Sequence, residues 1–123
     1  MTRINCVSPK ELHHKHLVAE YRELPRIFGF AFNAMKRGEK PTDSRNPTSY
    51  VLGAGHVRFF YPRLGYLRQR FFELVSEMQI RGFKPIHLAP PHVDLSDDWF
   101  TDWVPDEKAV ALNRERISQR MPK

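Results

Sequence analysis

The chain has 123 residues, of which 41% are hydrophobic and 12% aromatic, enough to bury one compact core. No apolar stretch approaches the roughly 18 residues of a membrane span, and charged residues interrupt the first twenty positions, where a signal peptide needs an apolar run. The single cysteine, Cys6, excludes an internal disulfide framework and a cysteine-rich zinc module. We therefore expect one cytoplasmic domain over residues 1–123, with Cys6 as a small core residue.

The net charge of +6 is unevenly distributed along the chain. Residues 85–107 contain six acids and no lysine or arginine, which leaves a net charge of +12 on the rest of the chain. Such a field attracts polyanions, and a nucleic-acid backbone is the usual polyanion for a basic cytosolic domain. A basic surface that only aids solubility is the alternative interpretation.

The first predicted helix begins at residues 8–11, where a serine cap, a proline at the first helical position and a glutamate form a capping box. Apolar residues then recur at helical spacing from Leu12 toward Met35, and Gly38 is a natural end. Pro25 interrupts this run. Because proline removes a backbone hydrogen bond and clashes with the preceding turn, we expect a bend near residues 23–26. Residues 39–49 are rich in turn-forming residues and predict an exposed loop.

Two more helices are predicted after this loop. One begins near Pro62 and ends at Gly82, and it has an apolar stripe from which Arg70 is excluded. The other begins at residues 105–107, where two acids follow a proline, and ends near Arg120. The apolar, glycine-interrupted segment 51–57 suits a close approach of the backbone between helices. Residues 83–104 hold both tryptophans and have no periodicity, so we expect a long loop that covers the core. The predicted fold is all-α, with three main helices, long irregular loops and the N-terminal segment packed near the first helix.

The amino terminus is the first candidate for catalysis. Because Thr2 is small, Met1 is normally removed and leaves a free α-amine on Thr2. The reference pKa of such an amine is about 7.7–8.0, roughly 2.5 units below that of lysine, so far more of it is unprotonated near neutral pH. The amine can attack an electrophilic carbon and form a Schiff base. The alternative is a terminus with no catalytic role, as in most proteins.

Glu23 is the matching candidate carboxylate. It lies between Arg22 and Arg26 at the proline bend, where neighbouring positive charge favours the ionised form. A carboxylate beside an oxocarbenium-like sugar stabilises the positive charge that develops as a base is lost, and it can afterwards act as a general base. A surface ion pair with either arginine is the alternative.

The histidines suggest no metal site. His13 and His16 share a helical face, but no third ligand of suitable spacing accompanies them, so we expect neither a metal nor another cofactor. His16 is better suited to a place near phosphate or sugar, with a partly exposed structural role as the alternative. His56 is interpreted as a hydrogen-bonded packing residue. No serine-histidine-aspartate arrangement with a glycine elbow and no phosphate-loop signature occurs in the chain.

Four groups of residues form a recognisable pattern. They are Met1-Thr2-Arg3-Ile4-Asn5; His16-Leu17 with Ala19-Glu20-Tyr21-Arg22-Glu23-Leu24-Pro25-Arg26; Leu52-Gly53-Ala54-Gly55-His56-Val57 with Phe59-Phe60-Tyr61; and Arg81-Gly82-Phe83. This pattern closely resembles the pyrimidine-dimer DNA glycosylases of the T-even phage type. The resemblance covers residues 1–83 without a gap and, less closely, the helix at 105–120, whereas residues 84–104 match poorly.

The resemblance implies a metal-free, helical DNA-repair enzyme, expected to be a monomer, that binds duplex DNA containing pyrimidine dimers or abasic sites. The Thr2 amine would attack the anomeric carbon of the dimer's 5′ nucleotide while Glu23 stabilises the cationic sugar. The resulting imine would allow β-elimination, so the enzyme would be both a glycosylase and an abasic-site lyase. The residues that would contact DNA are Arg3, Lys15, His16, Arg22, Arg26, Arg116 and Arg120.

Two departures from the family pattern bear on DNA binding. Lys15 stands where the phage enzyme has a glutamine, which adds a positive charge, and the chain ends at Lys123 without the aromatic and basic tail of the phage enzyme. Two other functions remain open. One is the same imine chemistry on abasic sites or on oxidised or ring-opened purines, and the other is DNA binding without catalysis.

Overall fold

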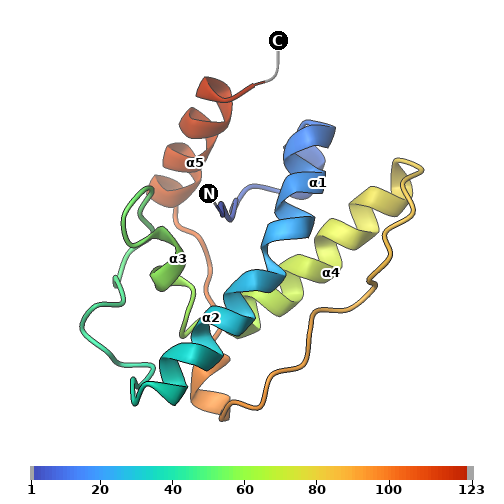
Figure 1. Cartoon of the computed structure of the whole chain (residues 1–123). Helices are drawn as coiled ribbons and strands as arrows, with labels where there is room; N and C mark the ends of the chain where they lie inside the picture. The colour runs from blue at the N-terminus through green and yellow to red at the C-terminus, as the bar shows by residue number, and fades with distance from the viewer. Residues whose placement is uncertain (1, 122–123) are drawn as a thin grey trace.

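The computed structural model describes residues 2–121, in which helices alternate with long irregular connections (Figure 1). The elements are η1 (Pro9–Glu11), α1 (His14–Glu23), α2 (Pro25–Lys36), α3 (His56–Phe59), α4 (Leu64–Ile80), η2 (Asp97–Trp99) and α5 (Glu107–Gln119). No β-strand occurs among the described residues, and the all-α prediction is confirmed. Within the same range, no helix is both long enough and apolar enough to span a membrane.

The first helix begins later than the capping pattern predicted. Ser8 accepts a hydrogen bond from the backbone N–H of Lys10, but the segment it caps is only the single 3-10 turn η1. Glu11 does not close a capping box, because its carboxylate binds the Arg114 guanidinium of α5 at 2.9 and 3.0 Å. The α-helix α1 starts at His14, with the His13 ring accepting from the N–H of Lys15 at 3.1 Å. The predicted start is therefore wrong by about one turn and a half.

Pro25 separates α1 from α2, as expected from its position in the apolar run. Leu24, between the two helices, keeps helical dihedral angles and donates its N–H to the carbonyl of Glu20 at 2.8 Å. The chain therefore changes direction without unwinding, and α1 and α2 follow one bent path (Figure 1). The predicted ends are also confirmed, because Gly38 and Gly82 adopt positive φ angles of 92° and 90° just after α2 and α4.

Segment 51–57 contains the start of α3, a short helix that the sequence pattern did not predict. Gly55 precedes this helix with a φ of 88°, a conformation that residues with a side chain rarely adopt. A Cβ at this position would lie 3.0 Å from the Cγ of Pro47. The predicted approach of the backbone between two helices is therefore wrong, because the close neighbour of Gly55 is the Pro47 side chain in the preceding loop.

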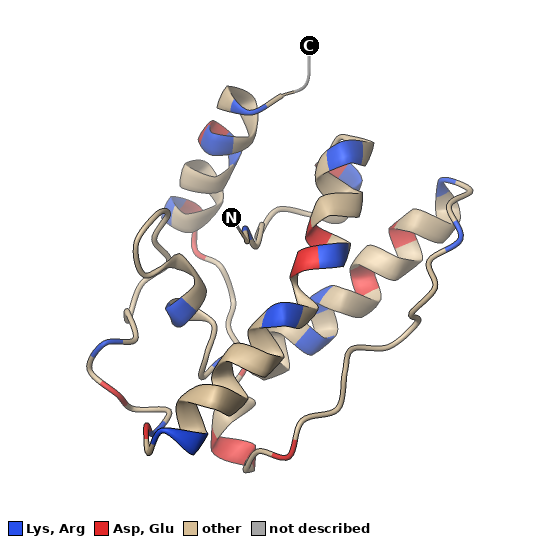
Figure 2. Cartoon of the chain, in the orientation of Figure 1, with Lys and Arg blue, Asp and Glu red and all other residues tan. Residues whose placement is uncertain are grey.

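Only part of the charge segregation of the sequence is also a segregation in space. Figure 2 shows the acidic residues around η2 at one end of the molecule, far from the start of α1 and the end of α5. Lysine and arginine occur on all the longer helices. The acids around η2 therefore lie away from the end of the molecule where the N-terminal segment passes between α1 and α5 (Figure 1), whereas Asp106 and Glu107 of the same acidic segment open α5.

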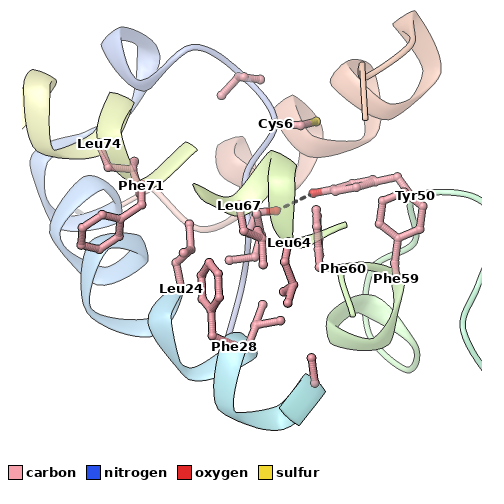
Figure 3. Close-up of a cluster of buried hydrophobic side chains, with 14 of the residues drawn as sticks. Cys6, Leu24, Phe28, Tyr50, Phe59, Phe60, Leu64, Leu67, Phe71 and Leu74 are labelled. Atoms are coloured by element: carbon pink, nitrogen blue, oxygen red, sulfur yellow. Dashed lines mark hydrogen bonds between the residues drawn. The ribbon is translucent and has the colours of Figure 1, made fainter. Parts of the chain in front are cut away.

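The core lies between α2, α3 and α4 and is rich in aromatic rings (Figure 3). The Tyr50 ring lies roughly perpendicular to the rings of Phe59 and Phe60, and Trp103 stacks on it at a centroid distance of 5.5 Å and an interplanar angle of 5°. Trp99 is also buried. The prediction that the tryptophan-containing loop covers the core is confirmed. Aromatic rings of this loop bury the apolar surface that a helix could otherwise cover.

Gly65, at the start of α4, allows this covering loop to lie against the helix. A Cβ at Gly65 would stand 2.5 Å from the Phe100 carbonyl oxygen and 3.0 Å from that of Thr101. We therefore expect Gly65→Ala to lower the free energy of unfolding by about 1–3 kcal/mol, although alanine is the better helix former. Urea denaturation followed by circular dichroism measures this free energy of unfolding. The matched control is Gly29→Ala in α2, where no atom lies within 4 Å of the added Cβ; equal stability of the two variants would contradict the contact.

Candidate active site

The N-terminal segment is held by side chains from distant parts of the chain. The N–H of Ile4 donates to His56 Nε2 at 2.8 Å, and the Ile4 carbonyl accepts from the Tyr50 hydroxyl at 3.0 Å, the bond that is dashed in Figure 3. The Tyr66 hydroxyl donates to the carbonyl of Asn5 at 3.3 Å. Because these hydrogen bonds hold the backbone of Ile4 and Asn5 in place, they also restrict the positions that Thr2 and Arg3 can take.

Two more side chains hold the next residues. The side-chain oxygen of Asn113, on α5, accepts the N–H groups of Cys6 and Val7 at 2.7 and 3.2 Å. The Arg70 guanidinium donates to the Val7 carbonyl. Asn113 is fully buried, so α5 is joined to the N-terminal segment from inside the protein.

A buried ion pair lies beneath this segment. Glu20 of α1 and Arg70 of α4 are 1% and 3% exposed, and the Arg70 Nε donates to Glu20 Oε2 at 2.8 Å. Asn5 adds a third partner, because its amide donates to Glu20 Oε1 at 2.8 Å and its oxygen accepts from Asn113. Burial alone would lower the pKa of Arg70, but the Glu20 carboxylate raises it overall. The guanidinium therefore stays charged inside the protein.

A cleft of about 330 Å³ opens between the N-terminal segment, α1 and α5. Its lining residues are Arg3, Asn5, His16, Ala19, Glu20, Glu23, Ile117 and Arg120. Thr2 directly precedes Arg3 and is itself buried. Four residues chosen from the sequence (Arg3, His16, Glu23 and Arg120) thus lie around one cleft, beside the start of the chain.

The cleft lining carries charges of both signs, with Arg3 and Arg120 beside Glu20 and Glu23. Burial lowers the pKa of Arg3, and the positive charges of Arg116 and Arg120 lower it further. The charge of Arg116 thus acts on Arg3, although Arg116 lines the neighbouring cavity between α5 and residues 48–52. Like charges at short range are unfavourable unless an anion joins them, so this group of three arginines is suited to bind a phosphate.

The remaining predicted DNA contacts lie outside the cleft lining. Lys15, Arg22 and Arg26 are exposed on α1 and α2, and none is among the residues around the cavity. No ion pair in the described part of the chain joins Glu23 to Arg22 or Arg26, so the alternative role for Glu23 as half of a surface ion pair is not observed.

The histidines occupy two different environments. His16 donates from Nε2 to the carbonyl of Arg120 at 3.0 Å, which joins α1 to the end of α5 beside the cleft. Its buried Nδ1 has no hydrogen-bond partner among residues 2–121. His56 makes hydrogen bonds through both ring nitrogens, which confirms its interpretation as a satisfied packing residue. No group of three metal-binding side chains occurs within residues 2–121.

Cys6 is buried in the core, as predicted, and burial raises the pKa of its thiol to about 11. Arg70 was expected on a polar helix face and is instead almost fully buried. Sequence reasoning also missed Asn5 and Asn113, since no local pattern distinguishes a buried amide from an exposed one. The only available signal was a charged residue, Glu20, at a helical spacing that placed it near the apolar face.

Comparison with known protein families identifies the part of the chain that holds most of this arrangement. A model of the pyrimidine dimer DNA glycosylase family matches residues 1–90. The match includes the N-terminal segment, α1 and α4, and thus the buried Glu20–Arg70 pair and every cleft residue except those on α5. Because it covers well over half of the 123 residues, the chain belongs to the pyrimidine dimer DNA glycosylase family.

Proposed function

We propose that this DNA glycosylase removes cyclobutane pyrimidine dimers from duplex DNA through an imine of the Thr2 α-amine, and then cleaves the strand by β-elimination. One observation carries the proposal: side chains from α3, α4 and α5 hold the backbone of the N-terminal segment beside a cleft that Glu23 lines. An amine that acts as a nucleophile must be held in a single place to gain from proximity.

In the first step the lone pair of the Thr2 amine attacks C1′ of the 5′ nucleotide of the dimer. The glycosidic bond breaks, its electron pair leaves with the base, and Glu23 stabilises the positive charge that develops on the sugar. Loss of a proton from nitrogen and opening of the sugar ring then give a Schiff base between Thr2 and C1′.

In the second step the imine makes the C2′ proton acidic. Glu23, or a water that it orients, removes this proton, and the electron pair forms a C2′–C3′ double bond while the 3′ phosphate leaves. Hydrolysis of the imine releases the unsaturated aldehyde and restores the free amine. An abasic site, which already carries an aldehyde at C1′, enters the same sequence at imine formation.

The DNA backbone is held by the basic residues on and around the cleft. The charges of Arg116 and Arg120 both act on Arg3, and the three arginines would share phosphates next to the lesion. Lys15, Arg22 and Arg26 would contact phosphates farther along the duplex, from the exposed side of α1 and α2. His16 would line the sugar side of the cleft. Since one chain provides all of these residues, we propose that the enzyme acts as a monomer.

Borohydride trapping tests the proposal, because borohydride reduces an imine to a stable amine. We expect protein lacking Met1 to form a covalent adduct with duplexes carrying a pyrimidine dimer or an abasic site, and none with undamaged DNA. Peptide mapping should locate the adduct at Thr2. Protein whose terminal amine has been acetylated serves as the matched control and should form no adduct.

The same experiment separates the other functions. DNA binding without any adduct would contradict the enzyme mechanism and support a binding domain. Equal rates on dimers and on ring-opened purines would contradict dimer selectivity while keeping the imine. An adduct mapped to a lysine side chain would exclude Thr2 as the nucleophile.

A further inference from the structure

We propose that His56 is a positioning residue for the Thr2 amine, because its ring accepts the N–H of Ile4 and so fixes the N-terminal segment beside the cleft. The inference rests on the proposed function, and it adds a residue that does not line the cleft. Ile4 is fully buried and lies two residues after Thr2, so its place determines where the amine can reach.

The hydrogen bonds of His56 fix its tautomer. Nδ1 lies 2.7 Å from the carbonyl oxygen of Val51, which can only accept, so Nδ1 carries the proton. Nε2 then holds a lone pair, which the N–H of Ile4 meets at 2.8 Å. A protonated imidazole carries a hydrogen on both nitrogens, so its Nε2–H would face the N–H of Ile4. The hydrogen bond from Ile4 to His56, which we call the Ile4 clamp, therefore requires neutral His56.

The surroundings of the ring keep it in this state. His56 is 3% exposed and contacts the rings of Tyr50 and Phe60 at centroid distances of 5.5 and 5.6 Å. Burial lowers its pKa below the usual 6.5, the hydrogen bond to Val51 opposes this, and Arg3 of the N-terminal segment and Arg116 of α5 lower the pKa further. The clamp is therefore complete above pH 6.5 and is lost as the pH falls through the folded-state pKa.

Tyr50 completes the clamp from the opposite side of the peptide. Its hydroxyl donates to the Ile4 carbonyl at 3.0 Å. The N–H and the carbonyl of Ile4 are thus both bound by residues of segment 50–56, which ends at the first residue of α3. The left-handed Gly55 sets the direction in which α3 presents His56. Segment 50–56 thus acts on the amine by holding the backbone of Ile4.

Two substitutions of His56 separate this role from simple packing. Glutamine can place an amide oxygen where Nε2 lies and accept from Ile4, whereas asparagine can place an amide nitrogen where Nδ1 lies and donate only to Val51. We expect the single-turnover rate of adduct formation to fall about tenfold to a hundredfold in His56→Asn and much less in His56→Gln, with similar DNA affinity in both. As the pH falls below 6.5 and through the lowered folded-state pKa of His56, the rate should fall more steeply in the wild type than in His56→Gln.

Hydrogen exchange of the Ile4 amide gives a readout that does not depend on catalysis. The amide should be protected in the wild type and in His56→Gln, and exposed to exchange in His56→Asn. If both His56 variants unfold, Tyr50→Phe keeps the aromatic ring and removes only the bond to the Ile4 carbonyl, and it should also slow adduct formation at unchanged DNA affinity.

Equal adduct rates in His56→Gln and His56→Asn, or a wild-type rate in Tyr50→Phe, would overturn the positioning role. Failure of the wild type to form any adduct would instead contradict the proposed function. In that case hydrogen exchange of the Ile4 amide still tests whether His56 holds Ile4. Slow exchange in the wild type with fast exchange in His56→Asn supports the hydrogen bond, and equal exchange rates in the two proteins overturn it.

Discussion

Replacing Glu23 by glutamine should lower the rates of base removal and strand cleavage by about 10²–10⁴-fold while DNA affinity stays nearly unchanged. Glutamine has the shape of glutamate, but it carries no charge to stabilise a cationic sugar and cannot take a proton at neutral pH. Glu23 lines the cleft and has no ion-pair partner within the described residues, so little structure depends on its charge. Single-turnover assays on dimer and abasic duplexes measure the two steps separately.

The control for this variant is Glu73→Gln, which removes an equal charge from an exposed position of α4 outside the cleft. It should keep the wild-type rates. If Glu23→Gln retained the wild-type rate in either step, Glu23 would have no part in that step. A loss of base removal alone would restrict its role to stabilising the sugar cation.

Replacing Arg70 by methionine should lower the free energy of unfolding by about 3–5 kcal/mol. The change leaves the Glu20 carboxylate buried with Asn5 as its remaining partner, and the Val7 carbonyl loses its donor. Burying a charge without its counter-charge is among the largest costs that a single substitution can cause. Urea denaturation monitored by circular dichroism, at pH 7 and constant salt, gives this free energy.

Arg68→Met is the matched control, because Arg68 is an exposed arginine on the same helix whose guanidinium lies 4.7 Å from the centre of the Phe100 ring. Its loss should cost no more than about 1 kcal/mol. A similar small effect of Arg70→Met would show that the Glu20–Arg70 pair contributes little, and that the N-terminal segment is held mainly by Asn113 and the Ile4 clamp.

The local signals in the sequence were reliable where a single residue decides the backbone. Pro25 cannot continue a regular helix, and Gly38 and Gly82 adopt the left-handed angles that end one, so these boundaries follow from chemistry that acts within one turn. Asp106 is similar, because its side chain accepts from the N–H of Ala109 at the start of α5. Such effects need no partner elsewhere in the chain.

The start of the first helix shows where local signals fail. The cap at Ser8 is present, but Leu12 is extended and ends the turn. The Glu11 carboxylate forms an ion pair with Arg114 of α5 instead of completing a capping box. A pairing between residues so far apart in the chain leaves no trace in helical periodicity. The helix α3 was missed for the same reason, since it depends on the buried contacts of His56 and Phe59.

By itself, the sequence determined the helical class, the bend at Pro25, and Thr2 and Glu23 as the candidate amine and carboxylate. Only the tertiary structure brought the charges of Arg116 and Arg120 to act on Arg3, buried Arg70 against Glu20, and turned His56 toward Ile4. The physical reason is that local patterns report conformation within a few residues, whereas the cost of burying charges and backbone polar groups is met by partners far away in the chain. The position of the chain's first residues is therefore a property of the whole fold.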